Sequence, residues 1–443
     1  MLAGCGGAGG GSTATGTPAG SPNASATLTL TLPASGLAPA DLAVIVAQGD
    51  PLSEAVGTAY LAARGVPTAN LIRVQLSTTK DSLSDTEFAA LRADIEAKLP
   101  AGIQATLLTW AAPSRVVGTC AMGITSAMTL GFDARYCVPS GSACTATAAS
   151  ALYDSETHRP QADLTLRPSM LLGASTLAGA QALIARGVAA DASLPTGVGW
   201  LLRTNDAGRS VRYPDFAPLP TDWGAALKLN YVDNSAGPSS ANSLANQSNL
   251  LFYLTGLPVV DHLSTLSFRP GALADSLTSF GGQLPQVEGQ MPITAWLAAG
   301  ATASYGTVDE PCNYPQKFSR ASVLIDQYWR GATAIEAYWK AVQWPGQGLF
   351  IGEPLAQPFR DAPSFAIVNG EYQIKTRNLR PGSRYLLQYG QDTAWTTLAS
   401  FTGVRGQPLD GRAPLPPATA TRLRWQGPCP NDPSVTCTLA TSP

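Results

Sequence analysis

From residue 41 to residue 111 the sequence alternates short, continuous apolar runs with stretches whose apolar residues recur at helical spacing. The runs predict buried strands and the stretches predict helices, namely strands over 41–48, 70–77 and 103–111 and helices over 49–66 and 84–99. Ser84, with Glu87 three residues later, is typical of a helix cap. This order predicts an α/β fold, with an open, mostly parallel sheet, helices on both of its faces and a Rossmann-like or caspase-like layout.

A second strongly helical stretch covers residues 321–344, and large apolar side chains recur along it. Leu324, Tyr328, Ile335 and Trp339 lie at intervals that are compatible with one buried face. We interpret this aromatic stripe as core packing and not as a cofactor site.

Composition divides the chain into three parts. Residues 6–27 are almost wholly Gly, Ser, Thr, Ala and Pro, which is typical of a flexible tether. After residue 360, short apolar runs separated by Gly, Pro, Asn and Asp predict strands, and "LRPGSRYLLQY" resembles the tyrosine corner of immunoglobulin-like sandwiches. We therefore predict a terminal segment over 1–27, an α/β domain over 28–360, and a small β-rich C-terminal domain and tail over 361–443.

The first residues, Leu2-Ala3-Gly4-Cys5, resemble the lipobox of bacterial lipoproteins. A secretory signal needs a charged region and an apolar stretch before its cleavage site, and neither precedes Cys5 here. We interpret this start as the tail of a truncated or misassigned signal peptide. The sequence thus predicts an exported protein on the periplasmic side of a bacterial membrane, anchored by a lipid on Cys5.

The charge and hydropathy of the chain limit the classes of partner that it is expected to bind. Charged residues make up 13% of the chain and the net charge is −2, so no basic surface is expected to attract nucleic acid. No run of about 18 apolar residues occurs, so no membrane-spanning helix is expected. The expected partners are an envelope protein or peptide, and the membrane through the lipid on Cys5.

Six further cysteines favour a compartment in which disulfides persist. Two close pairs, in "CVPSGSAC" and "CPNDPSVTC", enclose turn-forming residues, so we predict the disulfides Cys137–Cys144 and Cys429–Cys437. A third disulfide, Cys120–Cys312, would complete an even set. Histidines do not accompany these spacings, so we predict no metal site, and without a phosphate-binding motif we predict no cofactor.

Several blocks of residues 41–360 resemble a bacterial protein family that occurs in genomes with the exosortase sorting system. The most specific block runs from "WLAAGATASYGTVDEPCNYPQKFSRASVLIDQYW" to "GLFIGEPLAQPF", and "GDPLSEAVGTAYLAARGVPTANLIRV" and "LLFYLTGL" also belong to the resemblance. The resemblance implies an exported bacterial protein. It brings no established activity and no catalytic residues.

One pair of residues suggests catalysis. His262 and Cys312 each follow a predicted strand, in the order that caspase-type and gingipain-type cysteine peptidases use. In such enzymes the imidazole activates the thiol for attack on a carbonyl. No glycine follows His262, however, and Pro311 removes a backbone donor just before Cys312.

Two hypotheses therefore stay open. The first is a binding or assembly protein of the cell envelope, with a ligand edge built from the loops around Asp50, Arg115, Asp309 and Glu310. These loops follow predicted strands, and ligands of open α/β sheets bind beyond the carboxyl ends of the strands. The second is a cysteine-peptidase-like hydrolase that uses a His262–Cys312 dyad.

Overall fold

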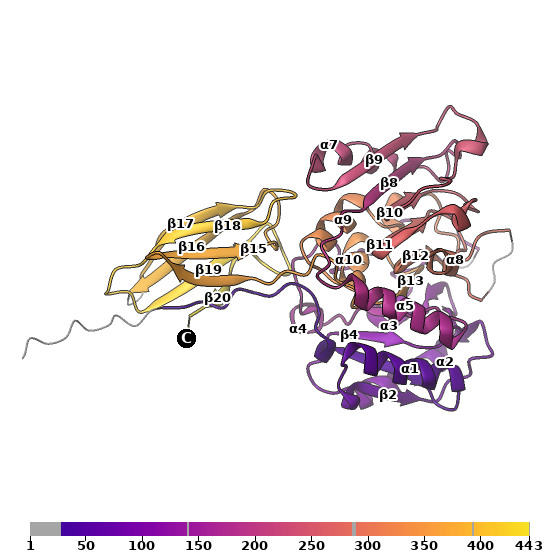
Figure 1. Cartoon of the computed structure of the whole chain (residues 1–443). Coiled ribbons are helices and arrows are strands. Elements are labelled where there is room, and N and C mark those ends of the chain that lie inside the picture. The colour runs from indigo at the N-terminus through magenta and orange to yellow at the C-terminus, as the bar shows by residue number, and fades with distance from the viewer. Residues whose placement is uncertain (1–27, 140, 286–288, 392–393, 443) are drawn as a thin grey trace, which may run out of the picture.

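The computed structural model describes residues 28–139, 141–285, 289–391 and 394–442. The predicted lipidation site at Cys5 and the predicted tether lie outside these residues. The described chain forms a large α/β domain and a smaller β domain beside it (Figure 1).

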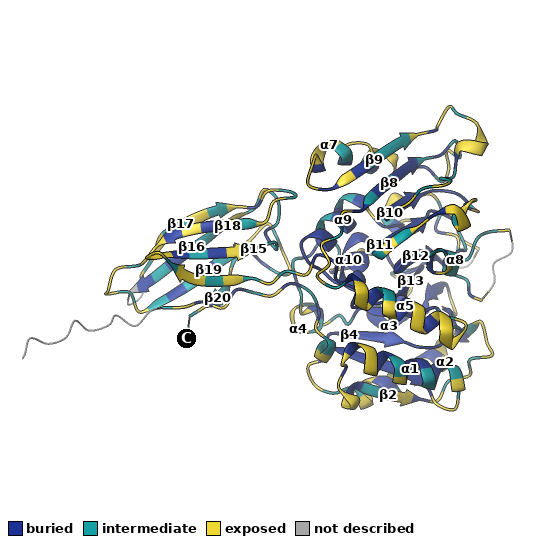
Figure 2. Cartoon of the chain, viewed as in Figure 1, coloured by how far each residue is buried: buried dark blue, intermediate teal, exposed yellow. Residues whose placement is uncertain are grey.

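A mixed sheet forms the centre of the α/β domain and contains ten of the described strands. Their order is β2 (Leu71–Val74), β1 (Leu42–Ala47), β4 (Ala105–Leu108), β7 (Ser169–Leu171), β13 (Gly348–Gly352), β12 (Ala303–Thr307), β11 (Phe268–Ser276), β10 (Leu250–Thr255), β8 (Val198–Arg203) and β9 (Lys228–Asp233). Pairing is parallel from β2 to β7 and from β12 to β9, while β13 runs antiparallel to β12. Strands β1, β4, β10 and β13 are buried along their whole length, as expected for a sheet covered on both faces (Figure 2).

Helices cover both faces of this sheet. On one face α1 (Pro51–Arg64) packs against α5 (Leu177–Ala190), and on the other α9 (Ala321–Trp329) packs against α10 (Ala334–Ala341) (Figure 1). The further helices of the domain are α2 (Asp85–Lys98), α3 (Ile124–Leu130), α4 (Pro160–Leu164), α6 (Tyr213–Phe216), α7 (Leu219–Trp223) and α8 (Thr294–Ala299). The predicted α/β fold class, with its mostly parallel sheet, is confirmed.

Local signals in the sequence explain where helices begin and end. The Ser84 side chain accepts the Glu87 backbone N–H, and the Glu87 side chain accepts the Ser84 N–H, which forms the predicted cap of α2. The stretch 321–344 forms two helices because Gly331 adopts a left-handed φ of 99° and Thr333 caps α10. The side chains of the predicted aromatic stripe, from Leu324 to Trp339, are fully buried in the core.

Loops from both halves of the sheet meet at one edge. Ser114, in the loop after β4, donates its hydroxyl proton to the Leu284 carbonyl and accepts the Leu284 N–H, and Leu284 lies in the loop after β11. A small sheet of β3 (Ser82–Ser84), β5 (Arg115–Val117) and β6 (Ala121–Gly123) covers the same edge. These hydrogen bonds join the loop that follows β4 to the loop that follows β11.

The β domain is built from two antiparallel sheets. One contains β14 (Ser364–Val368), β15 (Glu371–Thr376) and β18 (Leu409–Pro414), and the other contains β17 (Ala394–Thr402), β16 (Arg384–Gln391), β19 (Arg422–Pro428) and β20 (Thr436–Thr441). Their facing side chains, among them Ile374 and Trp425, share one core. The Tyr385 hydroxyl accepts the Arg380 backbone N–H at 2.9 Å, which is the contact of a tyrosine corner.

The first described residues belong to the β domain. Leu30 and Leu32 are buried in its core, and the Tyr372 hydroxyl donates a hydrogen bond to the Leu28 carbonyl. The predicted boundary at residue 28 is therefore too early for the α/β domain, because the apolar residues of segment 28–32 pack against strands from the far end of the chain.

Three disulfides form among the described cysteines, and two of them differ from the predicted pairs. Cys429–Cys437 is confirmed, whereas Cys137 pairs with Cys120 and Cys144 pairs with Cys312. The predicted pairs Cys137–Cys144 and Cys120–Cys312 are wrong because an isolated bridge between Cys120 and Pro139 brings the chain back beside Cys120. This contact places Cys137 in the core next to Cys120 and leaves Cys144 to reach Cys312.

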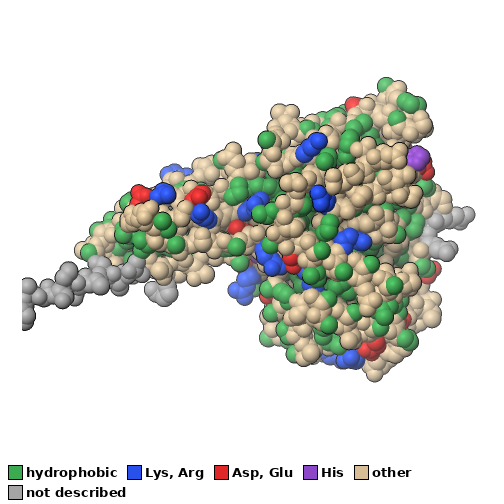
Figure 3. Space-filling model, in the orientation of Figure 1, with side chains coloured by type: hydrophobic (Ala, Val, Ile, Leu, Met, Phe, Trp, Pro, Cys, Tyr) green, Lys and Arg blue, Asp and Glu red, His purple; other side chains and the backbone are tan. Residues whose placement is uncertain are grey.

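Charged side chains are spread sparsely over the face that Figure 3 shows, with apolar and uncharged surface between them. Within the described residues no helix is long and apolar enough to cross a membrane.

Candidate functional site

A buried guanidinium lies where β10 and β11 end. Arg212, at the start of α6, donates from Nη1 to Asp275 Oδ1 at 2.7 Å and from Nη2 to the Thr255 carbonyl at 2.5 Å. Ser319 accepts a further Nη1 proton at 3.0 Å and donates its own hydroxyl proton to Asp275. Arg212 Nε is buried and has no hydrogen-bond partner among the described residues. These bonds hold the planar guanidinium of Arg212 in one orientation at the edge of the sheet.

A cavity of about 550 Å³ lies against this guanidinium. Arg212, Phe318 and Ser319 line it from inside, and Tyr153 and Leu219 add apolar surface. Concave sites with an apolar lining and a few convergent polar groups are the usual form of ligand sites. We name this space the Arg212 cavity.

Two further ion pairs lie along the Arg212 cavity. Arg320 Nε contacts Asp215 Oδ1 at 3.1 Å, and the same carboxylate accepts the backbone N–H of Ser322. Arg405 Nη1 contacts Asp222 Oδ2 at 3.0 Å. Because Arg405 lies between β17 and β18, the β domain contributes directly to the lining.

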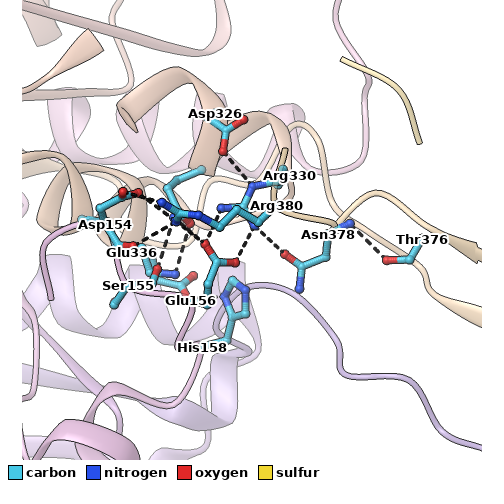
Figure 4. Close-up of polar contacts among 12 residues, drawn as sticks. Asp154, Ser155, Glu156, His158, Asp326, Arg330, Glu336, Thr376, Asn378 and Arg380 are labelled. Carbon is cyan, nitrogen blue, oxygen red and sulfur yellow. Dashed lines mark hydrogen bonds and ion pairs between the residues drawn. The ribbon is translucent and has the colours of Figure 1, made fainter. Parts of the chain in front are cut away.

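An ionic network holds the β domain in place (Figure 4). Arg330, at the end of α9, contacts both oxygens of Glu156 at 2.7 and 2.9 Å, and Arg380 of the β domain contacts Glu156 and Asp154. Burial alone would raise the pKa of Glu156, but the charge of Arg330 and its hydrogen bond lower this pKa to about 2. Glu156 is therefore ionised at any ordinary pH, and the junction is held by charge.

A second buried carboxylate fixes the segment that connects the domains. Glu336 Oε2 accepts the backbone N–H of Leu37, and Oε1 lies 2.9 Å from His158 Nδ1. The Gly36 nitrogen lies 3.1 Å from the same imidazole nitrogen. Burial would raise the pKa of Glu336, but His158 and Lys340 lower it to about 2.

The predicted ligand-edge residues do not form one site. Asp50 caps α1 by accepting the Ser53 N–H and the Thr78 hydroxyl proton; burial opposes these bonds, yet they lower its pKa overall. Arg115 lies in β5, where it pairs with Ser82 and Gly123. Among the contacts of the described residues, none joins Asp50 or Arg115 to each other or to Asp309 and Glu310.

Asp309 and Glu310 follow β12 and lie beside a buried lysine. Lys317 Nζ donates to Gln347 Oε1 at 2.7 Å, and Gln347 Nε2 donates to the Glu310 carbonyl at 2.9 Å. Burial lowers the pKa of Lys317 to about 8 against the opposing charges of Asp309 and Glu310. Burial also raises the pKa of Asp309, although hydrogen bonds from Glu310 and Gln347 oppose this effect.

The proposed His262–Cys312 dyad does not form. Cys312 is bonded to Cys144, so its sulfur is not a free thiol. His262 is exposed and precedes a short 3-10 helix over Leu263–Thr265. In this structure Cys312 therefore cannot supply the thiolate that the hypothesis of a cysteine nucleophile requires.

Sequence reasoning missed Arg212, Asp275 and Ser319. Asp275 lies at the end of the apolar run "GALADS", and an acidic residue at the end of a buried strand was the signal that could have identified it. Its partner Arg212 is 63 residues away in the sequence and carries no motif of its own. Groups of three or more metal-ligating side chains are not found among the described residues.

Comparisons with known proteins do not assign this chain to a family. No family model and no curated protein matches the chain. A solved structure named "Structure of Protease" is similar to it at 12% identity and a TM-score of 0.37, covering 91% of this chain and 98% of the other. A likeness at that level carries no argument about activity.

Proposed function

We propose that this protein is an exported, lipid-anchored protein of the bacterial cell envelope that binds a peptide segment of a partner in the Arg212 cavity. The observation that carries the proposal is the cavity itself, which combines a fixed buried guanidinium with lining from both domains. Its expected role is binding or assembly, linked to exosortase-type sorting systems, and not catalysis.

The disulfides support an exported protein. All six cysteines among the described residues are bonded, and disulfides persist outside the reducing cytoplasm. The bond between Cys144 and Cys312 also favours the binding hypothesis over the peptidase hypothesis, because it occupies the sulfur that the peptidase would need.

The lining of the cavity favours a peptide ligand. Asp215 with Arg320, and Asp222 with Arg405, present both signs of charge beside the aromatic rings of Tyr153 and Phe318. A peptide that carries acidic and basic side chains can exchange with these partly exposed pairs while its apolar atoms contact the rings. The buried ion pair between Arg212 and Asp275 then stays intact at the base of the cavity.

Binding is tested with synthetic peptides of equal length that carry acidic residues, basic residues, both or neither. We expect the peptides with both charges to bind, and we expect Arg320→Gln to weaken binding about tenfold, which equals about 1.4 kcal/mol. Arg135→Gln is the matched control because Arg135 pairs with Asp133 on an exposed loop outside the cavity. Equal affinities for all peptides, or equal loss in both variants, would contradict the proposed site.

The anchor is tested by fractionation of cells that make the protein behind a complete signal peptide. We expect it in the membrane fraction, released by detergent and not by salt. The same protein with Cys5→Ala should appear in the periplasmic fraction. An unchanged distribution of the Cys5→Ala variant would disprove the lipid anchor without bearing on peptide binding.

A further inference from the structure

Lys317 is a buried lysine whose amine donates to one hydrogen-bond acceptor among the described residues. The side chain is about 1% exposed, and Gln347 Oε1 is the hydrogen-bond acceptor that the described residues offer to its Nζ. The Tyr314 ring lies 5.5 Å from the amine. A lysine ammonium has three protons to donate, so burial with one acceptor leaves it poorly solvated.

The amide of Gln347 is held on both sides. Its oxygen accepts the Lys317 proton, and its nitrogen donates to the Glu310 carbonyl. The Asp309 carboxyl group lies near enough to this side chain for the Gln347 amide to lower its pKa. Backbone contacts fix it further, because the Gln347 carbonyl accepts the Val308 N–H at 2.8 Å. The amide carbon therefore lies beside the amine, and the amide nitrogen lies beside an acid.

We propose that Lys317 and Gln347 join in an intramolecular isopeptide bond, with Asp309 as the proton donor. The neutral Lys317 amine attacks Cδ of Gln347, and a tetrahedral intermediate forms. Its collapse breaks the bond between Cδ and Nε2, and Asp309 gives a proton to the departing nitrogen. The former lysine nitrogen then gives one of its protons to Asp309, which restores the carboxyl group of Asp309. One ammonia leaves for each secondary amide that forms, so no oxidant, reductant or other reactant is needed.

The surroundings meet the requirements of this reaction. Burial lowers the pKa of Lys317 to about 8 and raises the pKa of Asp309, so it moves the amine and the acid towards the neutral forms that take part. Val308, Phe318 and Tyr305 are buried around the pair and exclude water, which would otherwise compete with the amine. Fixed contact between reacting groups replaces a bimolecular encounter and supplies much of the rate.

The chain contains a matched control. Lys340 is also buried and donates to the side-chain oxygen of a buried glutamine, Gln327, at 3.3 Å. Glu156 and Glu336, two of the carboxylates near Lys340, have pKa values of about 2, so neither holds a proton to give to a leaving nitrogen. The proposal therefore predicts a cross-link at Lys317 and none at Lys340.

Intact-protein mass spectrometry tests the proposal. The full chain with Cys5→Ala is purified, fully reduced and weighed, so that neither a lipid nor the disulfides affect the result. We expect a mass lower than that of the sequence by one ammonia. Peptide mapping should then show a branched peptide that joins Lys317 to Gln347.

Variants locate the reaction. Lys317→Arg keeps a buried cation but removes the nucleophile, and Asp309→Asn removes the acid, so both chains should keep the full mass of their sequences. Lys340→Arg should still lose one ammonia. A parent chain at full mass, a loss that persists in Lys317→Arg, or a branched peptide at Lys340 would each overturn the proposal.

Discussion

Arg330 and Glu156 form a two-point ion pair that is almost completely withdrawn from solvent at the junction of the two domains. Arg380 reaches the same carboxylate from the β domain at 2.8 Å. Glu156 thus contacts guanidinium groups from both domains, while Asp326 also contacts Arg330 and Asp154 also contacts Arg380.

Glu156→Gln is expected to destabilise the chain strongly. The change leaves Arg330 buried with Asp326 as its remaining carboxylate partner, and the loss of one partner of a buried pair costs about 3–5 kcal/mol. The free energy of unfolding in urea measures the effect. Glu371→Gln is the control, because Glu371 forms an exposed pair with Arg412 and should lose less than about 1 kcal/mol. Similar losses in both variants would show that the junction does not depend on Glu156.

Stability is expected to fall in acid, between pH 4.5 and pH 2. The pKa of Glu156 and that of Glu336 are about 2 in the folded chain against an ordinary value of 4.5, so the unfolded chain binds protons first as the pH falls. The stabilisation that these carboxylates provide is complete above pH 4.5 and is lost towards pH 2, at a few kcal/mol for each group. Urea titrations across this range measure the loss, and Glu156→Gln should make the dependence shallower. A flat profile would contradict the ionised state of both groups.

Alkylation under denaturing, non-reducing conditions should label none of the six cysteines between Cys120 and Cys437. Peptide mapping should find Cys120 joined to Cys137 and Cys144 joined to Cys312. A label on Cys312 in the native protein would restore the cysteine-peptidase hypothesis.

The disulfides should differ in what they contribute to stability. Cys144→Ser opens a loop of 168 residues and should cost up to about 5 kcal/mol in the chain-entropy account. Cys437→Ser opens a loop of eight residues and should cost about 2–3 kcal/mol. Unfolding in urea compares the two, and a larger loss for Cys437→Ser would reverse this order.

Tyr385→Phe should destabilise the β domain by about 1 kcal/mol, because the Arg380 N–H loses its acceptor. Tyr389→Phe is the control, since the Tyr389 hydroxyl makes no hydrogen bond among the described contacts. The difference between the two unfolding midpoints, followed by tryptophan fluorescence, isolates the corner contact. Equal midpoints would mean that the corner adds nothing to stability.

The fold class could be predicted because its signals are local. The strand over Leu42–Ala47, the cap at Ser84 and the buried stripe from Leu324 to Trp339 each follow from a few neighbouring residues. Such patterns depend on the alternation of apolar and polar side chains, which the sequence states directly.

The site could not be predicted because its contacts are distant. Asp275 meets Arg212 only after the sheet has brought together the ends of β10 and β11, and the true partner of Cys312 depends on how segment 120–144 folds back. Sequence proximity favoured Cys137–Cys144, yet the bridge between Cys120 and Pro139 decides the pairing. The Lys317–Gln347 contact likewise joins the segment after β12 to the residue just before β13.

The packing of Leu30 and Leu32 against residues around Trp425 has a consequence for folding. Segment 28–32 precedes the α/β domain in the sequence, whereas the strands that it contacts follow that domain. The β domain therefore cannot complete its core until both segments have come together. A fragment that lacks either segment leaves apolar residues of the β domain exposed to solvent and to proteases.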